Sequence, residues 1–147
     1  MNRQPNESLR WFMVAGSINL FLAVALGAFG AHALKARLAP DLMVIFQTGN
    51  QYHFYHALGL LAVAAAAGFV PGSRLIRWSG MFIMAGLVLF SGSLYALSLT
   101  GQRWMGMIAP FGGTAFIFGW LLLQPVSGEG GDDAPAMGSG QQRSESR

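Results

Sequence analysis

The stretch QYHFYHALGLLAVAAAAGFV, residues 51–70, decides the fold of this chain. Its first six residues include two histidines and two tyrosines, and the run from Ala57 to Val70 that follows carries no charge. An uncharged run of this kind belongs either in a buried core or in a lipid bilayer. If it crosses a bilayer, we expect the polar residues at its start to lie where water gives way to hydrocarbon.

The composition favours the bilayer. Of the 147 residues, 53% are hydrophobic and only 10% are charged, against about 25% charged residues in an ordinary soluble domain. The chain has no cysteine, which excludes disulfides and thiolate chemistry from its own residues. Its nine Lys and Arg residues are scattered. Without a basic cluster interleaved with aromatic residues, the lipid bilayer is the expected partner and nucleic acid is not.

Four apolar segments have the length of membrane spans. They cover about residues 11–33, 54–70, 75–99 and 107–123. Residues 41–53, after Pro40, have apolar side chains at three- and four-residue spacing and predict an amphipathic lead-in, with a bend at Gly49–Asn50. We therefore expect an all-α membrane protein, an up-down bundle of four transmembrane helices over residues 11–124.

Polar segments flank this membrane domain. Residues 1–10 predict a loose N-terminus, and residues 125–147 have almost nothing to bury and predict a disordered tail. A basic start before an apolar run is also typical of a signal peptide, with Ala25–Gly27 as a cleavage site. However, the uncharged run is longer than a signal core of about 7–15 residues, so we expect it to remain as the first span.

Small residues recur every four positions in the first span and form a strip along one helical face. Such strips let helices approach closely in lipid. The residues expected to pack helices together are Ala15, Asn19, Ala23, Gly27, Ala31, Gly112 and Gly113.

Polar side chains near the span ends predict a pocket at one face of the bilayer. Its candidate residues are His32, Gln51, Tyr52, His53, His56 and Tyr95. Imidazoles can bind a metal ion, and a pair of them can bind haem. However, no metal or haem motif is present, and Asp41 is the only acid between residues 8 and 128. We therefore expect no catalytic residue, no metal and no cofactor.

The charges flanking the spans bear on orientation. With four crossings both termini share one side, which carries Arg3, Arg10, Arg74 and Arg77, whereas Lys35, Arg37 and Arg103 lie on the other. Because positive charge is enriched on the cytoplasmic side, we expect both termini in the cytoplasm.

Four sequence blocks, taken in order, carry a family resemblance. They are residues 27–35 (GAFGAHALK), residues 48–58 (TGNQYHFYHAL), residues 91–95 (SGSLY), and residues 110–113 (PFGG) with Gly119-Trp120. Over about residues 10–124 the chain resembles the small bacterial membrane-protein family known as domain of unknown function 423, and more distantly the eukaryotic transmembrane protein 256 group. The resemblance implies a multi-pass protein of the bacterial inner membrane, and it implies no activity or catalytic residues.

These observations favour a non-enzymatic protein that packs with itself or with another membrane protein. One alternative is a protein that handles a small molecule or ion in the polar pocket. Another is a membrane subunit that binds a metal or haem.

Overall fold

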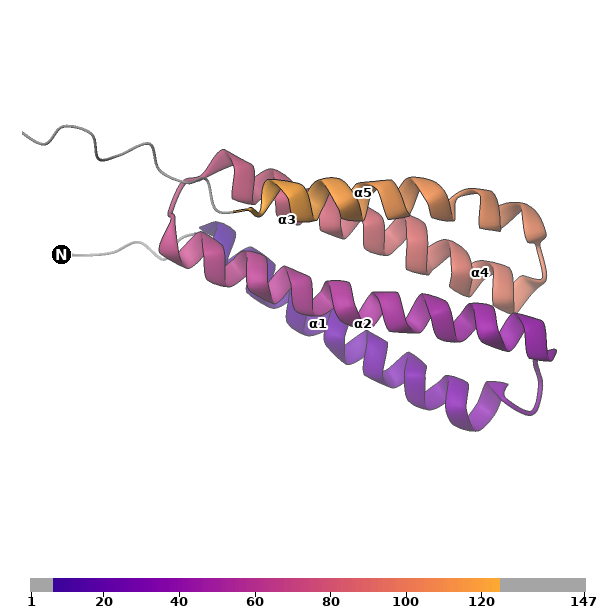
Figure 1. The fold of residues 1–147 in the computed structure, drawn as a ribbon. Helices are drawn as coiled ribbons and strands as arrows, with labels where there is room; N and C mark the ends of the chain where they lie inside the picture. Colours follow the sequence, from indigo (N-terminus) through magenta and orange to yellow (C-terminus); the bar gives the residue numbers. More distant parts are fainter. Residues whose placement is uncertain (1–6, 125–147) are drawn as a thin grey trace, which may run out of the picture.

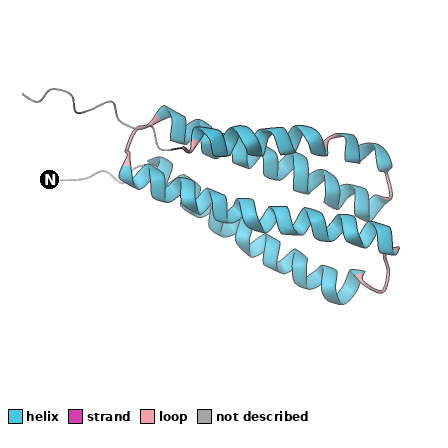
Figure 2. Cartoon of the chain, viewed as in Figure 1, coloured by secondary structure: helices cyan, strands magenta, loops and turns pink. Residues whose placement is uncertain are grey.

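The computed structural model describes residues 7–124, and this part of the chain is helical and contains no strand (Figure 2). Four helical segments in it are long and apolar enough to cross a membrane: Glu7–Leu34, Pro40–Phe69, Arg74–Thr100 and Arg103–Leu122. The predicted all-α fold with four membrane-spanning helices is therefore confirmed. The polar tail expected at residues 125–147 lies outside the described residues.

The first span consists of α1 (Glu7–Phe29) and a π-helical turn, η1 (Gly30–Leu34). The described part of the helix includes residues 7–10, ahead of the apolar run that starts at residue 11. The carboxylate of Glu7 lies in its first turn, where it interacts favourably with the positive end of the helix dipole. At the other end, Gly30 leaves room for the ring of Phe46, which a Cβ would meet.

The second span is a single helix of 30 residues, α2 (Pro40–Phe69). Pro40 stands at its start, where the missing N–H is not needed. The amphipathic lead-in expected over residues 41–53 is the first half of this helix, which stays α-helical through Gly49 and Asn50. Gly49 is buried against the side chain of Leu94, so this glycine allows close packing within a continuous helix.

The third span joins three segments without a break: α3 (Arg74–Gly86), the π-helical turn η2 (Leu87–Ser91) and α4 (Gly92–Thr100). The hydroxyl of Ser73 caps its start by accepting a hydrogen bond from the Ile76 N–H at 3.4 Å. Gly101 ends it with a left-handed φ of 72°, a conformation that favours glycine.

The last span consists of a short 3-10 helix, η3 (Arg103–Met107), and α5 (Ala109–Leu122). Gly112 is buried where α5 meets η2, and a Cβ there would overlap the backbone of Phe90. The glycine therefore sets how closely α5 approaches the third span.

The helices run alternately up and down, and α2 occupies the centre (Figure 1). One side of α2 packs against α1 and the other against α3, η2 and α4, while α5 packs on α3 and η2. The described ends of the chain lie at one end of the bundle, and the α1–α2 and α4–α5 connections lie at the other (Figure 1).

Two apolar clusters lie at different depths of the bundle. The larger joins all four spans and is formed by Phe12, Leu60, Val63, Ala64, Ile83, Leu87 and Phe116. The smaller is formed by Leu34, Met43 and Phe46, near the α1–α2 connection. Along α2 the stretch between the two clusters contains Asn50 and His53.

Candidate functional site

His53 lies at the centre of a chain of hydrogen bonds between three helices. It is 7% exposed. Its Nδ1 lies 3.2 Å from the Tyr95 hydroxyl of α4, and its Nε2 lies 3.2 Å from Asn19 Oδ1 of α1. Since Asn19 Oδ1 can only accept, Nε2 carries the proton, and Nδ1 of the neutral ring accepts from the Tyr95 hydroxyl.

Asparagine amides extend this chain on both sides. Asn50 Nδ2 donates to the Tyr95 oxygen at 3.1 Å and to the Ala23 carbonyl at 2.7 Å. At the other end, Asn19 Nδ2 donates to the Ala15 carbonyl at 2.8 Å. In the polar network of Asn19, Asn50, His53 and Tyr95, the Asn50 amide therefore donates in both directions, and the network ends on backbone carbonyls of α1 at both ends.

His56 has different surroundings. Its Nδ1 donates to the Tyr52 carbonyl at 2.8 Å, and its ring stacks on Phe116 of α5 with centroids 3.4 Å apart. The ring of Tyr52, one helical turn earlier in α2, is nearly parallel to the His56 ring, with centroids 5.9 Å apart. The groove beside these rings has a volume of about 510 Å³ and is lined mainly by aromatic side chains, among them Tyr52, Phe90, Phe116 and Trp120.

The six predicted pocket residues do not share one site. His53 and Tyr95 belong to the polar network, whereas Tyr52 and His56 line the aromatic groove. Gln51 faces outward and donates to the Tyr55 hydroxyl at 2.9 Å, and His32 is exposed in η1. Within residues 7–124, no three His, Asp or Glu side chains gather closely enough to hold a metal ion.

The depth of the histidines also differs from the expectation. The sequence placed them at the start of a span, at the water boundary, but His53 and His56 lie near the middle of α2. Residues 41–53 are part of the long helix, and their polar side chains bond other helices where they face the bundle. Asn50 was missed as a site residue. Its spacing of three from His53, which puts both on one helical face, was the available signal.

The predicted packing residues take different positions. Ala23 is 1% exposed against α2, and Gly27 leaves room for the amide of Asn50. Ala15 borders the larger apolar cluster, and Asn19 bonds His53. Ala31 is exposed, and Gly113 has only ordinary contacts with Phe90.

A row of polar side chains lies on the outward face of α2. Gln47, Gln51 and Tyr55, the outward row, follow one another at four-residue spacing and are exposed. Towards the other end of the helix, the same face continues with exposed Leu58, Ala62 and Ala65. A cleft of about 250 Å³ between the end of the first span and α2 borders the row and is lined by Gly27, Gly30, Ala31, Phe46, Gln47 and Gln51, among others.

Comparison with known proteins gives the family. The family described as "Protein of unknown function (DUF423)" matches residues 26–113. The UPF0382 membrane protein YwdK of Bacillus subtilis is 46% identical over 115 residues, which cover 78% of this chain and 94% of that protein. The UPF0382 inner membrane protein YgdD of Escherichia coli K12 is 40% identical over 118 residues, covering 78% and 86% respectively. No solved structure is significantly similar to the chain. With its four apolar spanning helices, the chain is an integral membrane protein and belongs to the DUF423 family, whose function is unknown.

Proposed function

We propose that this protein is a non-enzymatic membrane component that associates with a second copy of itself or with another membrane protein through the outward face of α2. The observation that carries the proposal is the outward row of Gln47, Gln51 and Tyr55 in a membrane-spanning helix. Amide side chains are costly to leave in hydrocarbon, and in membrane proteins they hydrogen-bond across helix interfaces.

The rest of the same face suits a helix partner. Ala62 and Ala65 are small and exposed, which permits close backbone approach, and the cleft beside Gln47 leaves room for a side chain from the partner. The outward face of α2 thus offers hydrogen bonds from the outward row in one half of the span and close packing at Ala62 and Ala65 in the other.

The polar network supports a non-enzymatic role. The groups best suited to acid–base chemistry, the imidazole of His53 and the phenol of Tyr95, use their polar atoms to join α1, α2 and α4. The asparagines at the two ends of the network bond backbone carbonyls of α1, so the network holds the bundle together.

The orientation is part of the proposal. Among the described residues, Arg10, Arg74 and Arg77 lie towards the end of the bundle where α1 and α3 begin, and Lys35, Arg37 and Arg103 lie towards the other. Arg103 forms an exposed ion pair with Asp41 at 3.7 Å. By its place in the sequence ahead of the first span, Arg3 adds a fourth cation to the first side. We infer that both termini face the cytoplasm, in a bacterial inner membrane.

Disulfide cross-linking in native membranes tests the association. The chain has no cysteine, so Gln51→Cys places a single thiol in the outward row, and Phe21→Cys places one on the exposed face of α1 at a similar distance from the α1–α2 connection. We expect Gln51→Cys to cross-link strongly and Phe21→Cys weakly. A product of twice the chain mass identifies a second copy, and another mass identifies a different partner, which must supply the second thiol. Equal cross-linking at both positions would contradict the proposal, and absence of the double-mass product for Gln51→Cys would exclude a second copy at this face.

A second candidate function rests on the aromatic groove. His56 is held there by the Tyr52 carbonyl through Nδ1 and stacked on Phe116, with Trp120 beside it. This arrangement suits a flat, apolar small molecule with a polar edge. Quenching of tryptophan fluorescence by such a compound, lost in Trp120→Leu, would support this function over the first.

A further inference from the structure

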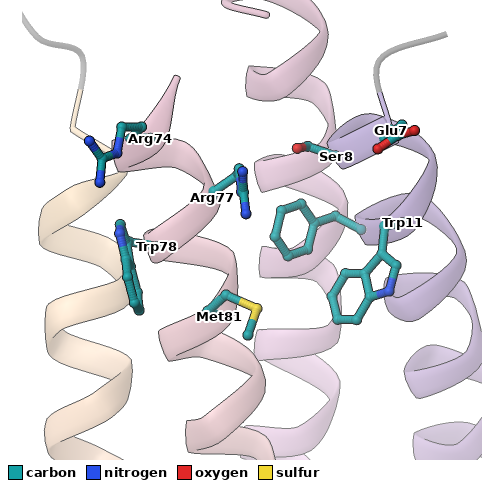
Figure 3. Close-up of a pocket in the computed structure, with 8 residues that line it drawn as sticks. Glu7, Ser8, Trp11, Arg74, Arg77, Trp78 and Met81 are labelled. Carbon is teal, nitrogen blue, oxygen red and sulfur yellow. The ribbon is translucent and has the colours of Figure 1, made fainter. Parts of the chain in front are cut away.

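We propose that an anionic phospholipid binds in the groove between the first turns of α1 and α3, with its phosphate on Arg74 and Arg77. The groove has a volume of about 510 Å³. Its lining comes from Glu7, Ser8, Trp11 and Phe12 of α1 and from Arg74, Arg77, Trp78 and Met81 of α3 (Figure 3). The site is separate from the outward face of α2.

The positive charges of the two arginines in the groove favour an anionic ligand. Arg74 and Arg77 are exposed, and within residues 7–124 neither forms an ion pair with a carboxylate. Both lie in the first turn of α3, which holds no acidic residue. Cations at a helix N-terminus repel the positive end of the helix dipole, and a bound phosphate relieves that repulsion. Arginine also offers several donors to a phosphate at once.

Glu7 is the opposing charge in this groove. It belongs to α1, across from α3, and Figure 3 shows Arg77 between the two helices and Arg74 farther from Glu7. No ion pair joins Glu7 to either arginine. The carboxylate therefore limits how far towards α1 a phosphate can lie, and it places the anion on the α3 side.

The apolar half of the groove distinguishes a lipid from a free phosphate. Trp11, Trp78 and Met81 are 51%, 55% and 51% exposed, and they follow the arginines in the direction of the membrane interior. Phe12 closes the floor, because its ring fills the space beside Gly80. Arg74 and Glu7 are the first residues of their spans, so the polar mouth lies at the membrane boundary. Indole rings favour that boundary, where a lipid has its phosphate and the first part of its acyl chains.

Lipid retention measured by native mass spectrometry tests the site. The protein is reconstituted in vesicles of phosphatidylcholine and phosphatidylglycerol and then extracted into a neutral detergent. We expect the wild type to retain phosphatidylglycerol in preference to phosphatidylcholine. In R74Q/R77Q the retention should fall about fivefold for each arginine removed, since a cation near an anionic lipid surface contributes about that factor.

The matched control is K35Q/R37Q, which loses the same charge from exposed positions at the opposite end of the bundle. It should retain phosphatidylglycerol as the wild type does, and E7Q, which removes the opposing carboxylate, should retain more. Equal losses in the two double variants would show diffuse attraction and overturn the proposal. Retention of both lipids alike would also overturn it. So would displacement of the bound lipid by inorganic phosphate, which would identify a free anion site.

Discussion

The surroundings of His53 illustrate how single residues hold this bundle together. Its ring bonds one helix through each nitrogen, α4 through Tyr95 and α1 through Asn19. Such bonds in the membrane contribute about 0.6 kcal/mol on average, and up to about 1.7 kcal/mol. A polar group left without its partner in a dry interior costs more than the bond itself contributes.

The first prediction concerns the coupling of His53 and Tyr95. His53→Leu should lower the free energy of unfolding by about 1–2 kcal/mol, because it leaves Asn19 Oδ1 without its donor and the Tyr95 O–H without its acceptor. In a double-mutant cycle with Tyr95→Phe, the two losses should be less than additive. The measurement is reversible unfolding in mixed micelles, and additive losses would show that the two side chains act independently.

The second prediction compares two buried serines of the third span. Ser79 Oγ donates to the Gly119 carbonyl of α5 at 2.7 Å, whereas Ser91 Oγ is buried in η2 without a partner among the described residues. Ser79→Ala should therefore lower the unfolding free energy by about 1 kcal/mol. Ser91→Ala should leave it unchanged or raise it, because it removes an unpaired hydroxyl. The same unfolding assay decides, and a larger loss for Ser91→Ala would mean that this hydroxyl has a partner.

At the scale of the elements, glycines set the distances between helices. The strongest case is α5 against η2, where a Cβ added at Gly112 would overlap the backbone of Phe90. A Cβ added at the neighbouring Gly113 would lie 3.9 Å from the Phe90 ring, which is an ordinary contact distance. A backbone contact cannot be relieved by turning a side chain, so the helices themselves would have to separate.

The third prediction uses these two glycines as a matched pair. Gly112→Ala should lower the unfolding free energy by about 1–3 kcal/mol through overpacking. Gly113→Ala should be neutral or slightly stabilising, because alanine has the higher helix propensity. Thermal denaturation of both variants in detergent is the measurement. A tolerated Gly112→Ala would show that α5 can shift away from η2 at little cost.

At the scale of the whole molecule, the bundle has two distinct ends. The described chain ends lie at one, and the α1–α2 and α4–α5 connections lie at the other (Figure 1). In a bilayer these ends face opposite compartments, since each of the four segments is long enough to cross.

The fourth prediction tests this arrangement with single cysteines in the cysteine-free chain. Ala36→Cys and Gln102→Cys are exposed in the two connections at one end, and Gln124→Cys is exposed at the other. A membrane-impermeant maleimide added to intact cells should label the first two and should label the third only after lysis. Labelling of Ala36→Cys and Gln102→Cys from opposite sides of the membrane would refute four crossings. If Gln124→Cys were the only variant labelled in intact cells, the orientation would be the opposite of the one we infer.

By itself, the sequence determined the fold class, the four apolar segments and the family. Lipid offers no hydrogen bonds to the backbone, so an uncharged run long enough to span it forms a helix whatever its neighbours are. The sequence blocks around Gly27–Lys35 and Pro110–Gly113 were sufficient to indicate the family, which the comparisons confirm.

Only the tertiary structure decided which polar residues meet. His32, His53 and His56 were grouped by their order along the chain, but His53 bonds Asn19 and Tyr95, His56 stacks on Phe116, and His32 is exposed. These partners depend on the rotation of each helix about its axis and on the axial offset between helices. Both are set by close contacts such as that of Gly112 with Phe90, between residues far apart in the sequence.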